Sequence, residues 1–184
     1  MLRNIDAMLR NILAITVIAG TVLTTTPAGA QFKALKGDPE ELSFGVISTE
    51  SSTALRKQWA PFLRVMEEQV GVKIKSFFAS DYAGVIEGLR FGKVHIALLG
   101  NKAAVEAVDR ANVEVFVQKT APGWVLGYNS VMISHVDNDR INTVEDVLKC
   151  DKSIDFGIGD PNSTSGFLVP SFYVFANNDV DPKA

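Results

Sequence analysis

Residues 42–47 read Leu-Ser-Phe-Gly-Val-Ile, a short and mostly apolar run. A run of this length and composition is typical of a strand that is buried on both faces. In residues 52–70 the apolar side chains are spaced three and four apart, which predicts an amphipathic helix capped by Ser52 and ended by Gly71. Pro61 is expected to kink this helix or to divide it in two. A buried strand followed by a helix is the first half of a βαβ unit.

The same alternation continues toward the C-terminus. Further strands are expected at residues 72–78, 95–99, 113–120, 128–134 and 154–158, and further helices after Asp81, Asn101 and Thr143 (the last reaching Cys150) and from near Thr164. Strands that alternate with helices form a mostly parallel sheet with helices on both faces, so the predicted fold class is α/β. Ligands bind such sheets beyond the carboxyl ends of the strands. The candidate site residues therefore follow the strands, at Ser48–Glu50, Ser80–Tyr82, Gly100–Asn101 and Gly159–Gly166.

The composition is that of a globular protein. Of the 184 residues, 47% are hydrophobic, which excludes a disordered chain. The chain has 18 Lys and Arg against 21 Asp and Glu, and this balance argues against nucleic acid as a partner, because phosphate backbones require a basic surplus. Cys150 is the single cysteine and cannot form an intramolecular disulfide, so we expect it to be buried and inert.

Residues 1–30 have the pattern of a cleaved secretory signal peptide. Its features are two arginines, an apolar run and small residues at the cleavage site, found at Arg3 and Arg10, residues 12–23, and Ala28-Gly29-Ala30. Cleavage is expected after Ala30, leaving residues 31–41 as a flexible N-terminal segment. The first five residues recur from Met8 onward, so either Met1 or Met8 is the start. An uncleaved anchor is the alternative, although the apolar run is shorter than the roughly 20 residues of a membrane span.

The most specific candidate site is the stretch 159–166, Gly-Asp-Pro-Asn-Ser-Thr-Ser-Gly, which leaves a predicted strand and opens a predicted helix. A helix start exposes amide N–H groups and partial positive charge, and Ser163, Thr164 and Ser165 add hydroxyl donors. This combination suits a tetrahedral oxyanion. The stretch lacks both the lysine of a phosphate-binding loop and the glycine spacing of a dinucleotide-binding loop. A Ser/Thr-capped helix that follows a turn is the purely structural alternative.

Tyr82 and Tyr128 are the next candidates, because a tyrosine beside a cleft offers a phenol donor and an apolar face to a small polar ligand. Half-buried packing is the alternative for both. His95 and His135 have no partner at metal-ligand spacing, so neither a metal nor a cofactor is expected. A serine nucleophile would need a general base that the sequence does not place. We therefore expect a protein that is not an enzyme, with an exported hydrolase or phosphotransferase as the alternative.

Three stretches carry a resemblance to a known family: residues 44–51, Phe-Gly-Val-Ile-Ser-Thr-Glu-Ser; residues 81–84, Asp-Tyr-Ala-Gly; and residues 159–170, Gly-Asp-Pro-Asn-Ser-Thr-Ser-Gly-Phe-Leu-Val-Pro. From about residue 42 to its end, the chain resembles the periplasmic phosphonate-binding proteins of phosphonate ABC importers. The resemblance implies a type II periplasmic-binding-protein fold, in which two α/β lobes close on a ligand. It places the first lobe at residues 42–124, and the crossover with a partial, incomplete second lobe at residues 125–184.

The resemblance also implies a function. The protein would be a periplasmic receptor that captures alkylphosphonates, such as 2-aminoethylphosphonate, and delivers them to the permease and ATPase of an ABC importer, meeting the membrane only through the permease. By the matched motifs, Ser163, Thr164 and Ser165 would hold the phosphonate oxygens. Tyr82 would reach across from the first lobe, and Tyr128 would line the cleft near the crossover.

Two observations keep other functions open. Leu98-Leu99 stands where the family commonly has an aromatic pair, so the floor of the cleft differs. Two full lobes need roughly 100–150 residues each, more than the chain provides. A binding protein for phosphate, phosphite or another oxyanion is one alternative, and an inactive truncated fragment is another.

Overall fold

The computed structural model describes residues 39–120, 122–123, 125–149 and 151–181. The predicted signal peptide with its cleavage site after Ala30, most of the predicted flexible segment, and the predicted burial of Cys150 lie outside these residues. Within them, no helix has both the length and the apolar character that crossing a membrane requires.

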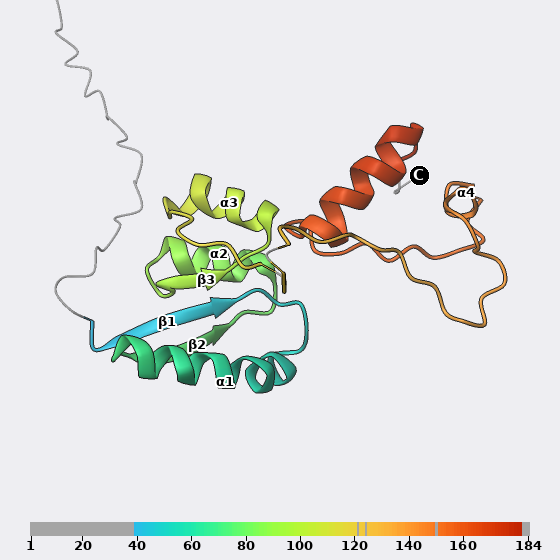
Figure 1. Ribbon diagram of the computed structural model, residues 1–184. Coiled ribbons are helices and arrows are strands. Elements are labelled where there is room, and N and C mark those ends of the chain that lie inside the picture. Colours follow the sequence, from blue (N-terminus) through green and yellow to red (C-terminus); the bar gives the residue numbers. More distant parts are fainter. Residues whose placement is uncertain (1–38, 121, 124, 150, 182–184) are drawn as a thin grey trace, which may run out of the picture.

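Strands and helices alternate through the first half of the described chain, as the sequence predicts. The elements are β1 (Glu41–Val46), α1 (Ser52–Val70), β2 (Lys73–Phe78), α2 (Tyr82–Arg90), β3 (Ile96–Leu98), α3 (Asn101–Ala111), α4 (Val144–Val147), η1 (Thr164–Leu168), η2 (Ser171–Phe175) and η3 (Ala176–Asn178). The last three adjoin one another in a helical run over residues 164–178, drawn in red in Figure 1. The helix that the sequence predicts from near Thr164 is therefore confirmed.

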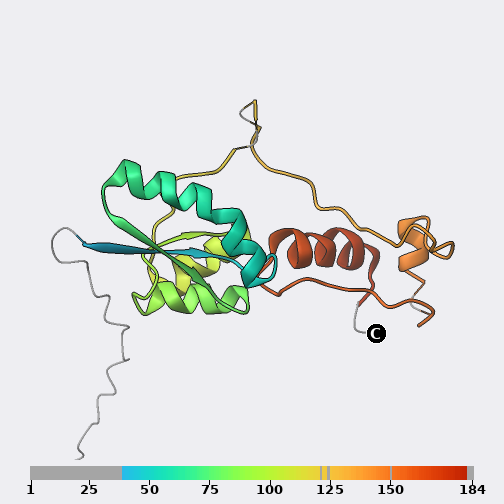
Figure 2. The same ribbon diagram turned by 90° about the horizontal axis from the view of Figure 1, so that it is seen from below.

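The sheet has three parallel strands in the order β2-β1-β3, with β1 at its centre. Phe44 of β1 lies opposite Ser76 on one side and Ile96 on the other. Helix α1 covers one face of the sheet, while α2 and α3 cover the other (Figures 1 and 2). The predicted α/β class with a parallel sheet between helices is confirmed. Because both neighbours of β1 are strands and both faces are covered, its residues 44–46 are buried.

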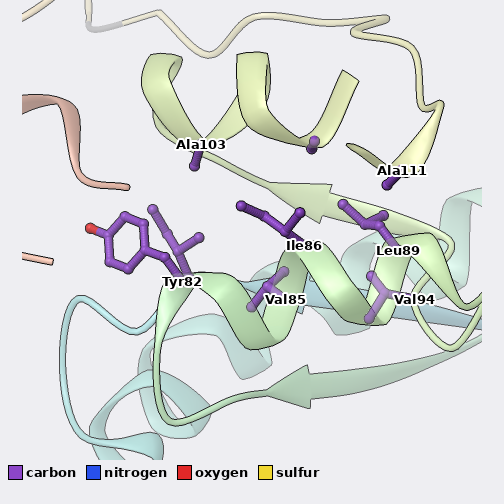
Figure 3. Close-up of a cluster of buried hydrophobic side chains, with 9 residues drawn as sticks. Tyr82, Val85, Ile86, Leu89, Val94, Ala103 and Ala111 are labelled. Carbon is purple, nitrogen blue, oxygen red and sulfur yellow. The ribbon is translucent and has the colours of Figure 1, made fainter. Parts of the chain in front are cut away.

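Two hydrophobic clusters lie on opposite faces of the sheet: Phe44 and Val46 of β1 belong to one, and Ile47, directly after the strand, belongs to the other. Phe44 and Val46 pack with Leu55 and Leu63 of α1. The second cluster joins the other face of the sheet to α2 and α3 (Figure 3), and its buried members are Ile47, Tyr82, Val85, Ile86, Leu89, Val94, Ala103, Ala107 and Ala111. The small alanine side chains let α3 lie close to α2. Gly45 has a similar role, since a Cβ there would lie 2.9 Å from Val94 Cγ1.

The N-terminal helix differs from its prediction at its cap, and of the two outcomes expected at Pro61, a kink or a division, the division does not occur. Its cap is Ser51 rather than Ser52, with the Ser51 hydroxyl accepting the Ala54 N–H at 3.3 Å. Pro61 lies inside α1 without dividing it, because packing on both sides of the proline, at Leu55 and Leu63, holds the helix against the sheet. Gly71 ends the helix as predicted, in the left-handed conformation with φ 68°.

The C-terminal half departs further from prediction. The strands expected at residues 113–120, 128–134 and 154–158 are not formed: the described residues there are extended but belong to no sheet. An extended segment becomes a strand only when its N–H and C=O groups pair with a neighbour. Thr143 caps a helix as expected, yet α4 is limited to Val144–Val147 and does not reach Cys150.

Candidate functional site

Two helix starts of the α/β unit are hydrogen-bonded to the hydroxyl-rich stretch 159–166. At the start of α2, the Tyr82 N–H donates to Asp160 Oδ2 at 3.3 Å. At the start of α3, the Lys102 N–H donates to Thr164 Oγ1 at 2.8 Å. Figure 3 shows Tyr82 and Ala103 at the same end of the buried cluster, and in Figure 2 the red helical run begins beside this end of the sheet. The starts of α2, α3 and the helical run therefore meet in one place.

The stretch 159–166 closes on itself through its two glycines. The Gly159 N–H donates to the Gly166 C=O at 2.7 Å. A Cβ at Gly159 would lie 2.9 Å from the Gly166 Cα, and a Cβ at Gly166 would lie 3.0 Å from Ser163 Oγ. Pro170, four residues after Gly166, has no N–H with which to compete for this carbonyl. Gly159 is thus required by close approach of the backbone, while a side chain at Gly166 would crowd the Ser163 hydroxyl.

Two hydroxyls at the start of the helical run accept hydrogen bonds from backbone N–H groups, and their own O–H groups are still available to donate. Ser163 is buried, and its Oγ accepts the Gly166 N–H at 3.0 Å. Thr164 Oγ1 accepts the Lys102 N–H, as described above. A hydroxyl that accepts still has one O–H to donate. These donors stand where a helix start exposes N–H groups and partial positive charge, so the arrangement can bind an anion without a cationic side chain.

Asp160 organises the turn before these hydroxyls. Its Oδ1 accepts the Asn162 N–H at 2.7 Å, and its carbonyl accepts the Ser163 N–H at 2.8 Å. The nearby cation at the start of α3, Lys102, is paired instead with Glu106, at 3.2 Å between Nζ and Oε1. Attraction for an anion at this site therefore comes from O–H and N–H donors rather than from an unpaired cation.

The segment that connects the two halves also contacts this stretch. Ser130 Oγ donates to the Ser165 carbonyl at 2.7 Å. Tyr128, two residues earlier, is 64% exposed. Tyr82 is only 8% exposed, and Figure 3 shows its phenol oxygen at the end of the buried cluster. The structure thus brings Ser163, Thr164, Ser165 and Tyr82 to one end of the fold and leaves Tyr128 on the surface.

Several residues of the site have roles that the sequence did not predict. Asn101 was expected to cap α3, but the cap position is Gly100 and forms no side-chain hydrogen bond there. The Thr164 hydroxyl serves α3 instead, from 62 residues away along the chain. Asp160 carries a local signal, because Asp-Pro-Asn is typical of a turn closed by the aspartate side chain. Its bond to α2 has no such signal. Among the described residues, no group of three or more His, Cys, Asp or Glu could hold a metal ion.

Comparison with known families gives a match over residues 44–184 to the model described as ABC transporter, phosphonate, periplasmic substrate-binding protein. The chain is 52% identical over 160 residues to the phosphonates-binding periplasmic protein of Escherichia coli K12, covering 87% of this chain and 45% of that protein. It is 37% identical over 139 residues to the phosphate-import protein PhnD of Mycolicibacterium smegmatis, covering 74% of this chain and 42% of that one. The chain therefore spans less than half the length of these curated relatives.

Two solved structures are similar to this one. A binding protein component of an ABC phosphonate transporter from Pseudomonas aeruginosa superposes with a TM-score of 0.74 and 54% identity, over 79% of this chain and 48% of that one. PhnD1 from Prochlorococcus marinus, solved in complex with methylphosphonate, gives a TM-score of 0.56 at 23% identity, over 79% of this chain and 53% of that one. The second likeness concerns the fold alone.

Proposed function

The chain belongs to the family of phosphonate periplasmic substrate-binding proteins of ABC transporters, and from this premise we propose that it is the anion-binding part of a periplasmic phosphonate receptor. The receptor captures alkylphosphonates, with 2-aminoethylphosphonate as the reference ligand, and delivers them unchanged to the permease and ATPase of an importer. One observation carries the proposal: the stretch 159–166, which contains Ser163, Thr164 and Ser165, is hydrogen-bonded to the start of α2 through Asp160 and to the start of α3 through Thr164.

The proposed chemistry follows from the donors. A phosphonate head group presents three oxygens in a tetrahedral arrangement, each able to accept more than one hydrogen bond. Ser163, Thr164 and Ser165 would donate their O–H groups to these oxygens at the start of the helical run, where partial positive charge favours an anion. Tyr82 would add its phenol from the side of α2. Tyr128 would line the cleft from the connecting segment.

The proposal includes an arrangement in two lobes. We assign residues 42–124 to the first lobe, and residues 125–184 to the crossover and part of the second. Closure of two lobes about a hinge would enclose the ligand, in the manner of other two-lobed binding proteins. Export through the signal peptide at residues 1–30, with cleavage after Ala30, would bring the receptor to the periplasm.

Calorimetric titration tests the proposal. The chain from Gln31 would be titrated with 2-aminoethylphosphonate, in parallel with a chimera that joins it to the part of the Escherichia coli relative beyond the matched region. Phosphonate binding by either protein supports the proposal, and its absence from both folded proteins overturns it. Replacing Ser163, Thr164 and Ser165 together by Ala should abolish detectable binding, because each hydrogen bond to a charged group contributes about 1.5–3 kcal/mol.

The chain offers a matched control for this triple substitution. Ser51, Ser52 and Thr53 form another hydroxyl triplet at a helix start, that of α1, and are exposed. Their replacement by Ala should leave phosphonate binding intact and lower only the stability of α1. Equal losses of binding from the two triplets would contradict the assignment of the ligand to the start of the helical run.

Phosphate is the second candidate ligand. One relative, 37% identical to this chain, is named a phosphate-import protein. The same hydroxyl stretch would hold phosphate, since both anions are tetrahedral. Competition in the titration decides between them: displacement of bound phosphate by micromolar 2-aminoethylphosphonate favours the phosphonate receptor, and the reverse preference favours phosphate. Phosphorus NMR of the recovered ligand separates a receptor from a hydrolase or phosphotransferase, because a receptor returns the ligand unchanged.

A further inference from the structure

The carboxylate of Asp160 connects two parts of the molecule through two separate oxygens. Oδ1 accepts the Asn162 N–H at 2.7 Å, a contact within the turn that precedes the hydroxyl stretch. Oδ2 accepts the Tyr82 N–H at 3.3 Å, a contact 78 residues away along the chain and at the start of α2. The side chain is partly buried, which limits competition from water for both bonds. One oxygen therefore shapes the turn, and the other holds that turn against α2.

The start of α2 has a second carboxylate beside it. Asp81 is the cap residue, and its Oδ1 accepts the Gly84 N–H at 2.7 Å. Two carboxylates at one helix start are favourable for the helix, because negative charge is stabilised there. They also leave this helix start poorly suited to a further anion. The start of α3 is served by the Thr164 hydroxyl. Of the three helix starts that meet at the site, that of α2 has carboxylate partners, whereas the described side-chain partners at the starts of α3 and of the helical run are the hydroxyls of Thr164 and Ser163.

We propose that Asp160 is a positioning residue that ties the Ser163–Ser165 stretch to the first amide of α2, and so fixes the orientation of the three hydroxyls relative to the α/β unit. For its consequence on ligand affinity, the inference rests on the proposed function. The hydrogen bond and close backbone approach between Gly159 and Gly166 hold the ends of the stretch together. The hydrogen bond from Tyr82 to Asp160 therefore also fixes the position of Ser163, three residues later. Asp160 itself need not touch the ligand.

Substitution by Asn separates the two oxygens. Asp160→Asn keeps one carbonyl oxygen, which can accept the nearby Asn162 N–H, but replaces the other oxygen by an NH2 group that cannot accept the Tyr82 N–H. Asp160→Ala removes both acceptors. Asp155→Asn is the matched control, because Asp155 is exposed and lies on the same stretch of chain ahead of the turn. The three variants thus distinguish a residue that only shapes its turn from one that also ties the turn to α2.

Amide hydrogen exchange, measured by NMR on the full chain, tests the hydrogen bond between Tyr82 and Asp160 without any ligand. In Asp160→Asn, we expect exchange at Tyr82 to become about 10- to 100-fold faster, the size of one lost hydrogen bond to a charged group, with Asn162 unchanged. In Asp160→Ala both amides should exchange faster, and in Asp155→Asn neither. Unchanged exchange at Tyr82 in Asp160→Asn overturns the inference, and this variant decides alone if Asp160→Ala does not fold.

Titration with methylphosphonate then reads the consequence for the site. We expect affinity about tenfold weaker in Asp160→Asn than in the unmodified protein, and the same affinity in Asp155→Asn. Binding that neither Asp160 variant weakens would overturn the positioning role. If the unmodified protein binds no phosphonate while exchange at Tyr82 responds as described, the tie to α2 stands and the proposed function alone fails.

Discussion

Residues 41–111 and residues 112–181 contain apolar side chains in similar patterns but place them differently. In the first region Val85 and Ile86 are 0% exposed, packed between the sheet and α3. In the second, Ile133 is 93% exposed and Val136 is 92% exposed. The difference lies in the available partners. Strand β1 has a strand on each side and helices on both faces, whereas the extended segments after α3 join no sheet of the described chain. An apolar segment is thus buried only where another strand or helix packs against it.

The largest effect that tests this difference between the two regions is expected when one isoleucine in each is replaced by alanine. Ile86→Ala should lower the free energy of unfolding by about 2–5 kcal/mol, because it removes buried methyl groups and leaves a cavity between α2 and α3. Ile133→Ala should change it by less than about 0.5 kcal/mol. Urea unfolding followed by circular dichroism measures both. Equal losses from the two substitutions would mean that the second region is as closely packed as the first.

The next substitution concerns the stretch 159–166, through which the second region is hydrogen-bonded to the first. Gly159→Ala places a Cβ 2.9 Å from the backbone of Gly166, so the closed stretch must open, at a cost of about 1–3 kcal/mol. Gly157→Ala is the matched control, because a Cβ there meets nothing within 4 Å. Phosphonate affinity should fall by more than tenfold in the first variant and stay the same in the second. Thermal unfolding checks that both variants remain folded.

The sequence predicted the first region well because its signals are local. Asp81 before α2 and Gly71 after α1 are placed by short-range hydrogen bonds that depend on neighbouring residues alone. The buried character of residues 42–47 required a sheet around them, and the sheet is there. In the second region the strand predictions at residues 113–120 and 128–134 were wrong, since alternating apolar residues indicate what could pair and not whether a partner is present.

The sequence predicted the part of the candidate site that lies within residues 159–166, but not the residues from elsewhere in the chain that contact it. Ser163 lies at a helix start, as the pattern of residues 159–166 indicates. The partners of that stretch could not be predicted, because they are distant in the sequence: Lys102 lies 62 residues from Thr164, and Tyr82 lies 78 residues from Asp160. Asn101 illustrates the limit: the sequence assigned it a capping role, whereas a threonine from the distant hydroxyl stretch supplies the hydrogen bond.

Tyr82 and Tyr128 allow the two regions to be compared at the candidate site itself. Tyr82→Phe removes the phenol oxygen and keeps both the ring and the N–H that donates to Asp160. Phosphonate affinity should fall by about tenfold or more, corresponding to one hydrogen bond to a charged group of about 1.5–3 kcal/mol. Tyr128→Phe should have the smaller effect, since Tyr128 is 64% exposed against 8% for Tyr82. Calorimetry on the two variants tests this order, and a larger effect at Tyr128 would show that the ligand is held mainly by the connecting segment.

The smallest expected effect concerns α4, a four-residue helix in which local polar contacts accompany one buried side chain, Val147. The hydrogen bond from Lys149, at 2.7 Å, and the N–H groups of Asn142 and Thr143 hold the pKa of Asp146 below its usual range. A lowered pKa in the folded chain means that these contacts stabilise α4 at pH values above the ordinary carboxyl pKa, and that this stability is lost as the pH falls through the lowered pKa. Lys149→Met should therefore raise the pKa of Asp146, with Lys119→Met as the control. Carboxyl-carbon NMR across an acid titration measures the shift, and an unchanged pKa in Lys149→Met would assign the lowering to the backbone N–H groups alone.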